Sequence, residues 1–212
     1  MISEHIQTAV ERATVTLPKK KGRGVLVGGN LILTAAHCIS CNCSGSMMNG
    51  QGNSQWVTHG GKRFRVAPAA IEPEGDVAVL EMVGTHDENT LKDIERFMCF
   101  CKETPPVSLY EGLPEVKEAF PVYVYNLNRT WVAGMATLCK TGASGLFVET
   151  NKPIDSGASG GPIINEAGEL VGIVSVFKTI PEGSSEKCTG MFARPLLALP
   201  VWVCRRILGR DV

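Results

Sequence analysis

The 212-residue chain carries 21 basic and 21 acidic residues, so its formal net charge is zero, and 44% of its residues are hydrophobic. That hydrophobic share is ordinary for a globular protein and excludes a disordered chain. The balanced charge gives no overall field for nucleic acid or an anionic membrane surface, so neither is an expected partner. The local cluster KKKGR (Lys19 to Arg23) is interpreted as a solvated turn.

The N-terminal segment contains Glu4 and Glu11 and no pattern of a secretory signal. A cytoplasmic protein is therefore the prediction, although a mature secreted form would have the same appearance and stays open. No apolar run approaches the ~20 residues that span a bilayer.

Short β-like runs bounded by Gly, Asn, Asp, Ser and Pro dominate the chain, which is typical of barrels and sandwiches. The expected strands cover residues 24–29, 30–36, 62–72, 76–83, 120–127, 130–140, 145–150, 161–166, 169–177 and 188–194. Helical patterns occupy residues 3–12, 88–98 and 195–208. NLNRTW and NEAGE are predicted hairpin turns, with Gly168 suited to a positive φ.

Three stretches carry candidate chemistry. LILTAAHC is a hydrophobic strand that ends in two alanines before His37, and these small residues let the chain turn out of a core. GDVAVLEM places Asp76 at the start of an alternating apolar strand, and DSGASGGPI surrounds Ser159 with small residues. Taken singly, each stretch also fits an ordinary turn or a surface histidine.

Acyl transfer explains why these residue types belong together. A serine hydroxyl becomes a good nucleophile when a neutral imidazole takes its proton and a carboxylate fixes the imidazole tautomer. The oxyanion then requires two backbone N–H donors, here expected from Ser159 and Gly157. Glycine at position 157 can adopt backbone angles that a side chain would penalise, and Gly160 and Gly161 leave space for the imidazole and the next strand.

In this order, TAAHC, DVAVLE and GASGGPI resemble the chymotrypsin-type serine proteases, whose triad runs His, Asp, Ser along the chain. The longer stretch ETNKPIDSGASGGPIINEAGELVGI is most similar to HtrA-like and bacterial trypsin-like peptidases, without a PDZ segment. The resemblance spans about Ile6 to Leu208. It implies an all-β protease unit of two six-stranded antiparallel barrels with a C-terminal helix. The first barrel is expected in residues 1–90, the connection in 91–118, and the second barrel with the helix in 119–212.

The same resemblance suggests where a polypeptide substrate binds. The substrate backbone would pair with the strand edge at Ser175, Val176 and Phe177, and the pocket for the residue before the cleaved bond would be formed by Pro153, Ile154, Gly190 and Phe192. None of these residues is acidic, so a small or medium apolar side chain is the expected occupant.

The eight cysteines leave three alternatives open. An even count permits disulfides, and thiols that are simply free or buried are equally compatible with a chain of this size. Cys-x-Cys pairs also suit zinc, because some viral chymotrypsin-like proteases hold a structural zinc in this way. The candidate ligands would be Cys41, Cys43, Cys99 and Cys101, but the prediction is that no metal or other cofactor is required.

The function predicted from these observations is that of a serine endopeptidase with His37 as the base, Asp76 as its orienting group and Ser159 as the nucleophile. The alternative is a non-catalytic or latent peptide-binding module on the same scaffold, activated by a regulatory partner or domain.

Overall fold

Two closed antiparallel barrels make up most of the molecule. The computed structural model describes residues 2–39, 54–84, 88–112, 119–138, 145–175 and 188–211. The strands of the first barrel are β1 (Thr14–Leu17), β2 (Gly22–Val27), β3 (Leu31–Thr34), β4 (Gln55–His59), β5 (Lys62–Glu72) and β6 (Val77–Met82). Those of the second are β7 (Phe120–Tyr125), β8 (Trp131–Leu138), β9 (Gly145–Thr150), β10 (Pro162–Ile164), β11 (Leu170–Ile173) and β12 (Cys188–Ala193).

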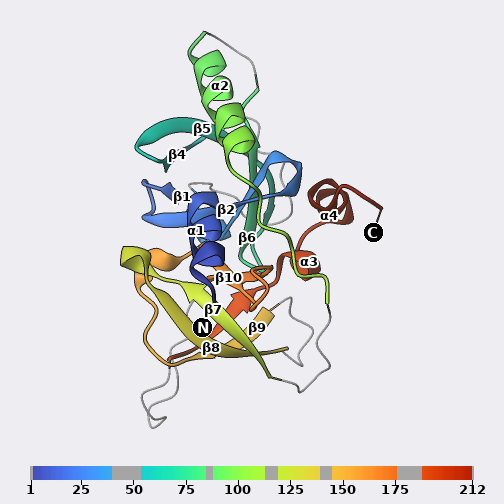
Figure 1. Cartoon of the computed structure of the whole chain (residues 1–212). Coiled ribbons are helices and arrows are strands. Elements are labelled where there is room, and N and C mark those ends of the chain that lie inside the picture. Colours follow the sequence, from blue (N-terminus) through green and yellow to red (C-terminus); the bar gives the residue numbers. More distant parts are fainter. Residues whose placement is uncertain are drawn as a thin grey trace.

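The neighbour order is β1-β2-β3-β6-β5-β4 in the first barrel and β10-β11-β12-β9-β8-β7 in the second (Figure 1). This arrangement confirms the two-barrel fold expected from the sequence. All the expected strands are present: β5 and β9 have the predicted ends, and the others have shifted ends. Gly168 in the NEAGE turn has a φ of 83°.

Two strands, β1 and β4, are absent from the sequence-based prediction. β1 has only four residues and follows directly on a helix, so its alternation of buried Val15 and Leu17 with outward threonines is too short to stand out. β4 is nearly as short. The two strands pair at Thr16 and Thr58, and this pairing closes the first barrel.

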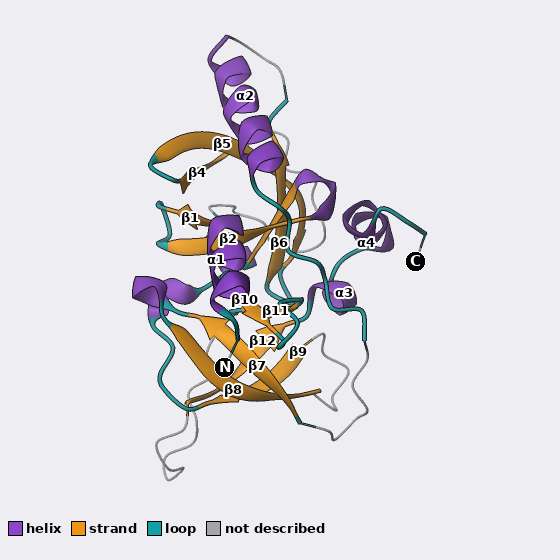
Figure 2. Cartoon of the chain, viewed as in Figure 1, coloured by secondary structure: helices purple, strands orange, loops and turns teal. Residues whose placement is uncertain are grey.

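In the described part of the chain, four α-helices lie outside the barrels (Figure 2). α1 (Glu4–Ala13) starts at Ser3, whose hydroxyl accepts a hydrogen bond from Ile6 N at 3.3 Å, and it lies in front of the junction between the barrels. α2 (Glu88–Glu103) extends beyond the predicted residue 98. It belongs to the first barrel, because the rings of Phe97 and Phe100 pack 5.9 and 5.8 Å from the ring of Phe64.

The helix expected over residues 195–208 is divided into α3 (Pro195–Ala198) and α4 (Val201–Leu208). Pro200 explains the division, because the residue before a proline is driven towards extended backbone, and Leu199 has φ −89° and ψ 150°. Of the helices described, none has the length and hydrophobicity needed to cross a bilayer.

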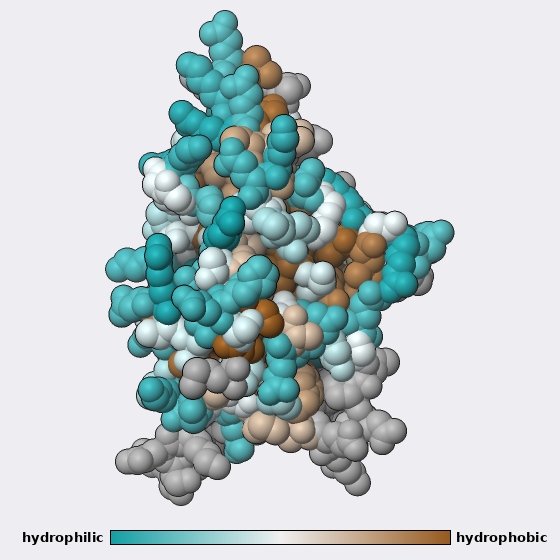
Figure 3. All heavy atoms as spheres, in the orientation of Figure 1, coloured by the Kyte–Doolittle hydropathy of each residue, from teal (hydrophilic) through white to brown (hydrophobic). Residues whose placement is uncertain are grey.

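The larger hydrophobic core fills the first barrel and continues into the junction through Tyr123, Ile164, Leu170 and Ile173 of the second barrel. A smaller core fills the rest of the second barrel. The outer face shown in Figure 3 is mainly hydrophilic over α1 and α2, whereas hydrophobic side chains reach the surface beside α4. The barrels are therefore joined by apolar contacts, and the residues that face this junction determine the site.

Candidate active site

His37 and Asp76 come from adjacent turns of the first barrel. His37 lies in the 3₁₀ turn η2 (Ala36–Cys38), which follows the fully buried β3. Asp76 immediately precedes β6, the strand paired with β3, and Ala36 N donates to Asp76 O at 3.1 Å. Asp76 has a φ of 51°, a left-handed conformation that costs energy in a residue with a side chain. The pairing of β3 with β6 thus places these two turns side by side.

Two hydrogen bonds join the histidine to the carboxylate. His37 N donates to Asp76 Oδ1 at 3.0 Å, and His37 Nδ1 lies 2.8 Å from Asp76 Oδ2. A carboxylate oxygen only accepts, so Nδ1 carries the proton and the neutral imidazole has its lone pair on Nε2. The structure therefore brings together two of the three residues predicted for catalysis, in the tautomer that a general base requires.

Ser175 makes a contact that the sequence analysis missed. It was expected to bind substrate, but its hydroxyl donates to Asp76 Oδ2 at 2.7 Å. Nothing in the local sequence connects residue 175 with residue 76, which is 99 positions away, so only the fold reveals this bond. The bond helps to hold the Asp76 carboxylate in position beneath His37.

The electrostatics of the pair follow from these bonds. The hydrogen bond with Asp76, with a further contribution from Cys38, raises the pKa of His37 from 6.5 to about 10, against the opposing effect of burial. Burial by itself would raise the pKa of Asp76, but the hydrogen bonds from His37 and Ser175 outweigh it and lower that pKa. Both shifts favour the charged forms, imidazolium and carboxylate, which are the forms present after the base has taken a proton.

The raised pKa of His37 predicts an alkaline activity profile. The base form of the imidazole is gained as the pH rises through this pKa, so kcat/KM of the free enzyme should increase with pH with a midpoint well above 6.5. Asp76→Asn removes the main cause of the shift, and we expect the midpoint of the His37 imidazole signal in an NMR titration to fall towards 6.5. A wild-type midpoint at or below 6.5 would contradict the prediction.

Ser159 is placed by the second barrel. It follows the 3₁₀ turn η4 (Ser156–Ala158) and precedes β10. Ser159 O accepts from Arg23 N of β2 at 2.8 Å, and Gly160 N donates to Val174 O at 2.7 Å. The turn that carries the serine is thereby attached to both barrels.

Gly160 explains how the serine turn approaches the histidine turn. Its φ is 76°, and a Cβ added there would lie 2.2 Å from Arg23 O, 2.5 Å from Thr34 Oγ1 and 3.0 Å from Ala35 N. Only glycine fits so close to the segment that leads into His37. The fold thus brings the turns of His37, Asp76 and Ser159 to the junction between the barrels.

The oxyanion-hole prediction needs one correction to its reasoning. The left-handed backbone falls at Gly160 and not at Gly157. At Gly157 an added Cβ would lie 3.1 Å from Leu127 Cδ2, a tight contact that a small shift of the leucine side chain would relieve. In this structure the Ser159 hydroxyl donates to Ser156 O at 3.3 Å. Since the C=O and N–H of one trans peptide point in opposite directions, the N–H of Gly157 points away from the hydroxyl.

The expected substrate pocket is described only in part. Ile154 is buried and Pro153 is exposed. Gly190 and Phe192 lie in β12, where they pair with Val148 and Leu146 of β9. Val176 and Phe177 lie outside the described residues.

Asn126, which the sequence analysis did not single out, holds the segment that carries Pro153. Its amide nitrogen donates to Pro153 O at 3.3 Å, and its amide oxygen accepts from Asp155 N at 2.9 Å. Asn126 is itself buried, so it links the end of β7 to the wall of the predicted pocket.

The structure shows the state of some of the cysteines. Cys38, Cys99, Cys101 and Cys204 are free thiols in the structure, and Cys41 and Cys43 lie outside its described residues. Cys99 and Cys101 lie on α2, where residues two apart point to different sides, so they do not face one ion together. Cys99 instead donates to Glu103 Oε1 at 3.0 Å. Across the described ranges, no group of three or more His, Cys, Asp or Glu residues could hold a metal ion.

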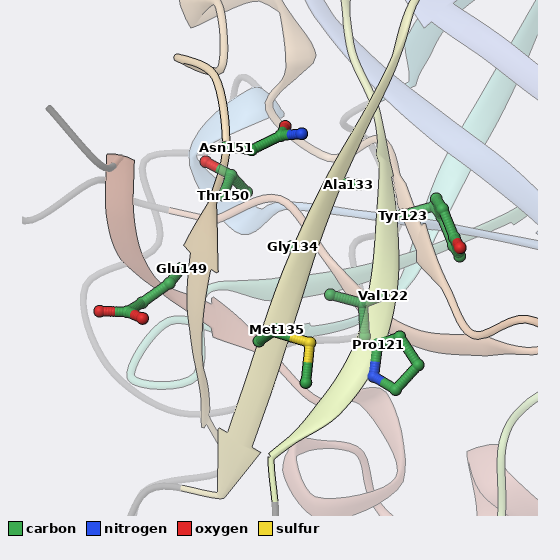
Figure 4. A pocket seen from close by; sticks show the side chains of 9 residues that line it. All are labelled: Pro121, Val122, Tyr123, Ala133, Gly134, Met135, Glu149, Thr150 and Asn151. Carbon is green, nitrogen blue, oxygen red and sulfur yellow. The ribbon is translucent and has the colours of Figure 1, made fainter. Parts of the chain in front are cut away.

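A hollow of about 320 Å³ on the outer face of the second barrel contains none of these residues (Figure 4). It crosses β7, β8 and β9 over Gly134, and Met135 and Glu149 border it. The chemistry assembled at the junction between the barrels has no counterpart in this hollow.

Comparison with known proteins identifies the family to which the chain belongs. The sequence profile of the trypsin-like peptidase domain matches residues 22–173, and no curated protein sequence matches the chain. Among solved structures, the Rv3671c protease from Mycobacterium tuberculosis in its active form has 18% identity and a TM-score of 0.56, over 98% of this chain and 85% of that one. The inactive form of Rv3671c has 19% identity and a TM-score of 0.56, over 92% and 89% of the two chains.

These structural likenesses are at low identity and concern the fold, whereas the profile covers most of the chain, including His37, Asp76 and Ser159. The chain therefore belongs to the trypsin-like peptidase domain family, within the chymotrypsin-like serine protease superfamily.

Proposed function

We propose that the protein is a serine endopeptidase that cleaves polypeptides through an acyl-enzyme intermediate. The observation that carries the proposal is the doubly hydrogen-bonded pair of His37 and Asp76, packed beside the turn of Ser159. In the neutral imidazole this arrangement puts the proton on Nδ1 and the lone pair on Nε2, and that Nε2 is the base that a serine nucleophile needs.

In the proposed reaction, His37 Nε2 removes the proton of Ser159 as its Oγ attacks the peptide carbonyl. Asp76 stabilises the imidazolium that results, and Ser175 helps to hold Asp76 in place. The imidazolium then protonates the leaving amine, which departs and leaves an acyl group on Ser159. Water, deprotonated by His37, hydrolyses that ester and regenerates the hydroxyl.

Two local movements precede attack in this scheme. The Ser159 hydroxyl exchanges its hydrogen bond with Ser156 O for one with His37 Nε2. The peptide between Ser156 and Gly157 rotates so that the N–H of Gly157, together with that of Ser159, faces the carbonyl oxygen of the substrate.

The same hydrogen bond gives specific support to a second candidate, a latent protease. Because Ser159 donates to Ser156 O, the oxyanion donors are not assembled in this conformation. A regulatory partner or flanking domain that favours the rotated peptide would then switch the enzyme on.

Labelling with a fluorophosphonate tests the proposal and separates the two candidates. We expect the purified protein to gain one covalent label, located on Ser159 by peptide mass spectrometry, and to lose it when His37→Ala removes the base. Labelling without hydrolysis of peptides would favour the latent form. Peptide hydrolysis by a folded protein that gains no label on Ser159 would contradict a serine mechanism.

A further inference from the structure

A polar cavity of about 730 Å³ lies on the outside of the first barrel. It lies between α1, the β1–β2 hairpin, the β4–β5 turn and the hairpin between β7 and β8. We call it the arginine cavity, because Arg12, Arg23 and Arg129 line it together with Thr16 and Thr58.

The floor of the arginine cavity is a row of polar side chains across three adjacent strands. Thr16 of β1 is paired with Arg23 of β2 on one side and with Thr58 of β4 on the other. Directly paired residues project from the same face of a sheet, and here Thr16 is exposed while its neighbours are half-buried, so the row faces outwards. At roughly 4.8 Å between strands, it offers two hydroxyl groups and the side chain of Arg23, whose guanidinium lies 4.5 Å from the centroid of the Tyr125 ring, along about 10 Å.

The cavity carries an excess of positive charge. Within the described parts of the chain, no ion pair involves Arg12, Arg23 or Arg129. Arg12 donates to Glu103 O at 3.2 Å, and Arg23 donates to Asn126 O at 2.7 Å, but backbone carbonyls do not neutralise a charge. Lys19–Lys21, in the turn of the same β1–β2 hairpin, are also exposed and outside every ion pair described.

Acidic groups near the cavity are fewer than basic groups. Glu11 is the carboxylate in its lining, and it accepts a hydrogen bond from Trp131 Nε1 at 3.2 Å. Asp155 acts on Arg23 through space, with no direct contact described. Three arginines and one carboxylate therefore line the cavity, and Lys19–Lys21 lie in a hairpin that borders it, which leaves a net positive surface suited to an anionic ligand.

The position of the cavity relative to Ser159 identifies the ligand as part of the substrate. Arg23, at the end of the polar row, donates its backbone N–H to Ser159 O at 2.8 Å. At the oxyanion turn, the Cβ position of Gly157 is 3.1 Å from Leu127 Cδ2 and 3.5 Å from Lys21 O. Both hairpins that border the cavity thus also border the oxyanion turn.

A peptide that enters along Ser175 and passes Ser159 continues towards these two hairpins. The segment it presents to them is the one after the cleaved bond, because the segment before that bond occupies the strand edge at Ser175. The first four residues of this segment, when extended, reach roughly 13 Å beyond the reacting carbonyl.

We propose that the arginine cavity and Lys19–Lys21 bind acidic side chains on the leaving-group side of the substrate. The natural substrates would then be polypeptides with Asp or Glu within about four residues after the cleaved bond. Planar guanidinium groups bind carboxylates through two parallel hydrogen bonds, and the threonine hydroxyls add single donors. This inference rests on the proposed endopeptidase function and specifies its substrate class.

Matched peptides test the proposal. Two peptides share the sequence before the cleaved bond and carry either Asp and Glu or the isosteric Asn and Gln at the four positions after it. We expect kcat/KM to be about tenfold higher for the acidic peptide at low salt and the difference to shrink in 0.5 M NaCl, where charges are screened beyond roughly 4 Å. Arg129→Gln should reduce the ratio, and Arg129→Glu should reverse it.

Arg63→Gln is the control, because Arg63 is an equally exposed arginine that stacks 4.3 Å from the ring of Trp56 and takes no part in the cavity. It should leave the ratio and the activity unchanged. Equal rates on the two peptides, from an enzyme that cleaves both, would overturn the inference while the endopeptidase function stands.

Binding to the Ser159→Ala protein provides a readout that does not depend on hydrolysis. Fluorescence anisotropy should show tighter binding of the acidic peptide than of its amide counterpart, and equal affinities would overturn the inference. If inorganic phosphate binds but the two peptides remain indistinguishable, the cavity is a site for small anions and the substrate assignment is wrong.

Discussion

Ser159→Ala should abolish peptide hydrolysis. Replacing the hydroxyl removes the nucleophile itself, and the loss in kcat should be on the order of 10⁴- to 10⁶-fold, as when the serine of comparable enzymes is removed. The residual rate would come from the groups that bind the substrate and the oxyanion. Continuous cleavage of a quenched fluorescent peptide measures both values.

The fold should survive this substitution. Ser159 is half-buried, and its side chain makes one hydrogen bond, to Ser156 O at 3.3 Å, so the free energy of unfolding should change by less than about 1 kcal/mol. Circular dichroism and urea denaturation check this point. Full turnover by folded Ser159→Ala protein would rule out the assigned nucleophile.

Gly160→Ala should both destabilise the protein and inactivate it. The added methyl group would lie 2.2 Å from Arg23 O, and the φ of 76° is unfavourable for alanine. The backbone must therefore move where the serine turn meets the histidine turn. We expect a loss of about 3 kcal/mol or more in the free energy of unfolding, measured in urea, and a loss of activity in whatever fraction still folds.

Gly209→Ala is a matched control for the backbone conformation. Gly209, at the end of α4, also has a positive φ, 67°, but a Cβ added there meets no atom within 4 Å. The substitution should cost about 1 kcal/mol from conformation alone and leave activity intact. If the two variants lose the same stability, the close approach to Arg23 O is not what makes position 160 special.

The fold was predictable wherever a strand was long enough to show its pattern. VAVLEM and FPVYVY are apolar runs bounded by turn residues, and both are strands. β1 was not predicted, because its four residues contain too little alternation to indicate a strand. Its stabilisation comes from the barrel, through the pairing of Thr16 with Thr58. α2 was predicted too short because its last turn, residues 99–103, is held by the packing of Phe100 on Phe64, a contact that the local sequence does not show.

The candidate site was predictable where the chemistry is written in local motifs. His37, Asp76 and Ser159 each follow or precede a recognisable strand, and the fold brings their turns together. What the sequence could not predict depends on hydrogen bonds between distant segments. The Ser175 hydroxyl donates to the Asp76 carboxylate, the Asn126 side-chain amide donates to Pro153 O, and Arg23 N donates to Ser159 O. These partners have no fixed spacing, because the barrels and not the local chain determine them.

The donation from Arg23 N to Ser159 O has a wider consequence. The first barrel contributes the proton acceptor and its carboxylate, and the second contributes the hydroxyl. The hydrogen bond from Arg23 N to Ser159 O joins the two barrels next to that hydroxyl. A slight sliding of one half against the other would separate the reacting atoms while every strand stayed intact. Heat, denaturant or a ligand that binds between the barrels would then abolish activity before circular dichroism showed any loss of secondary structure.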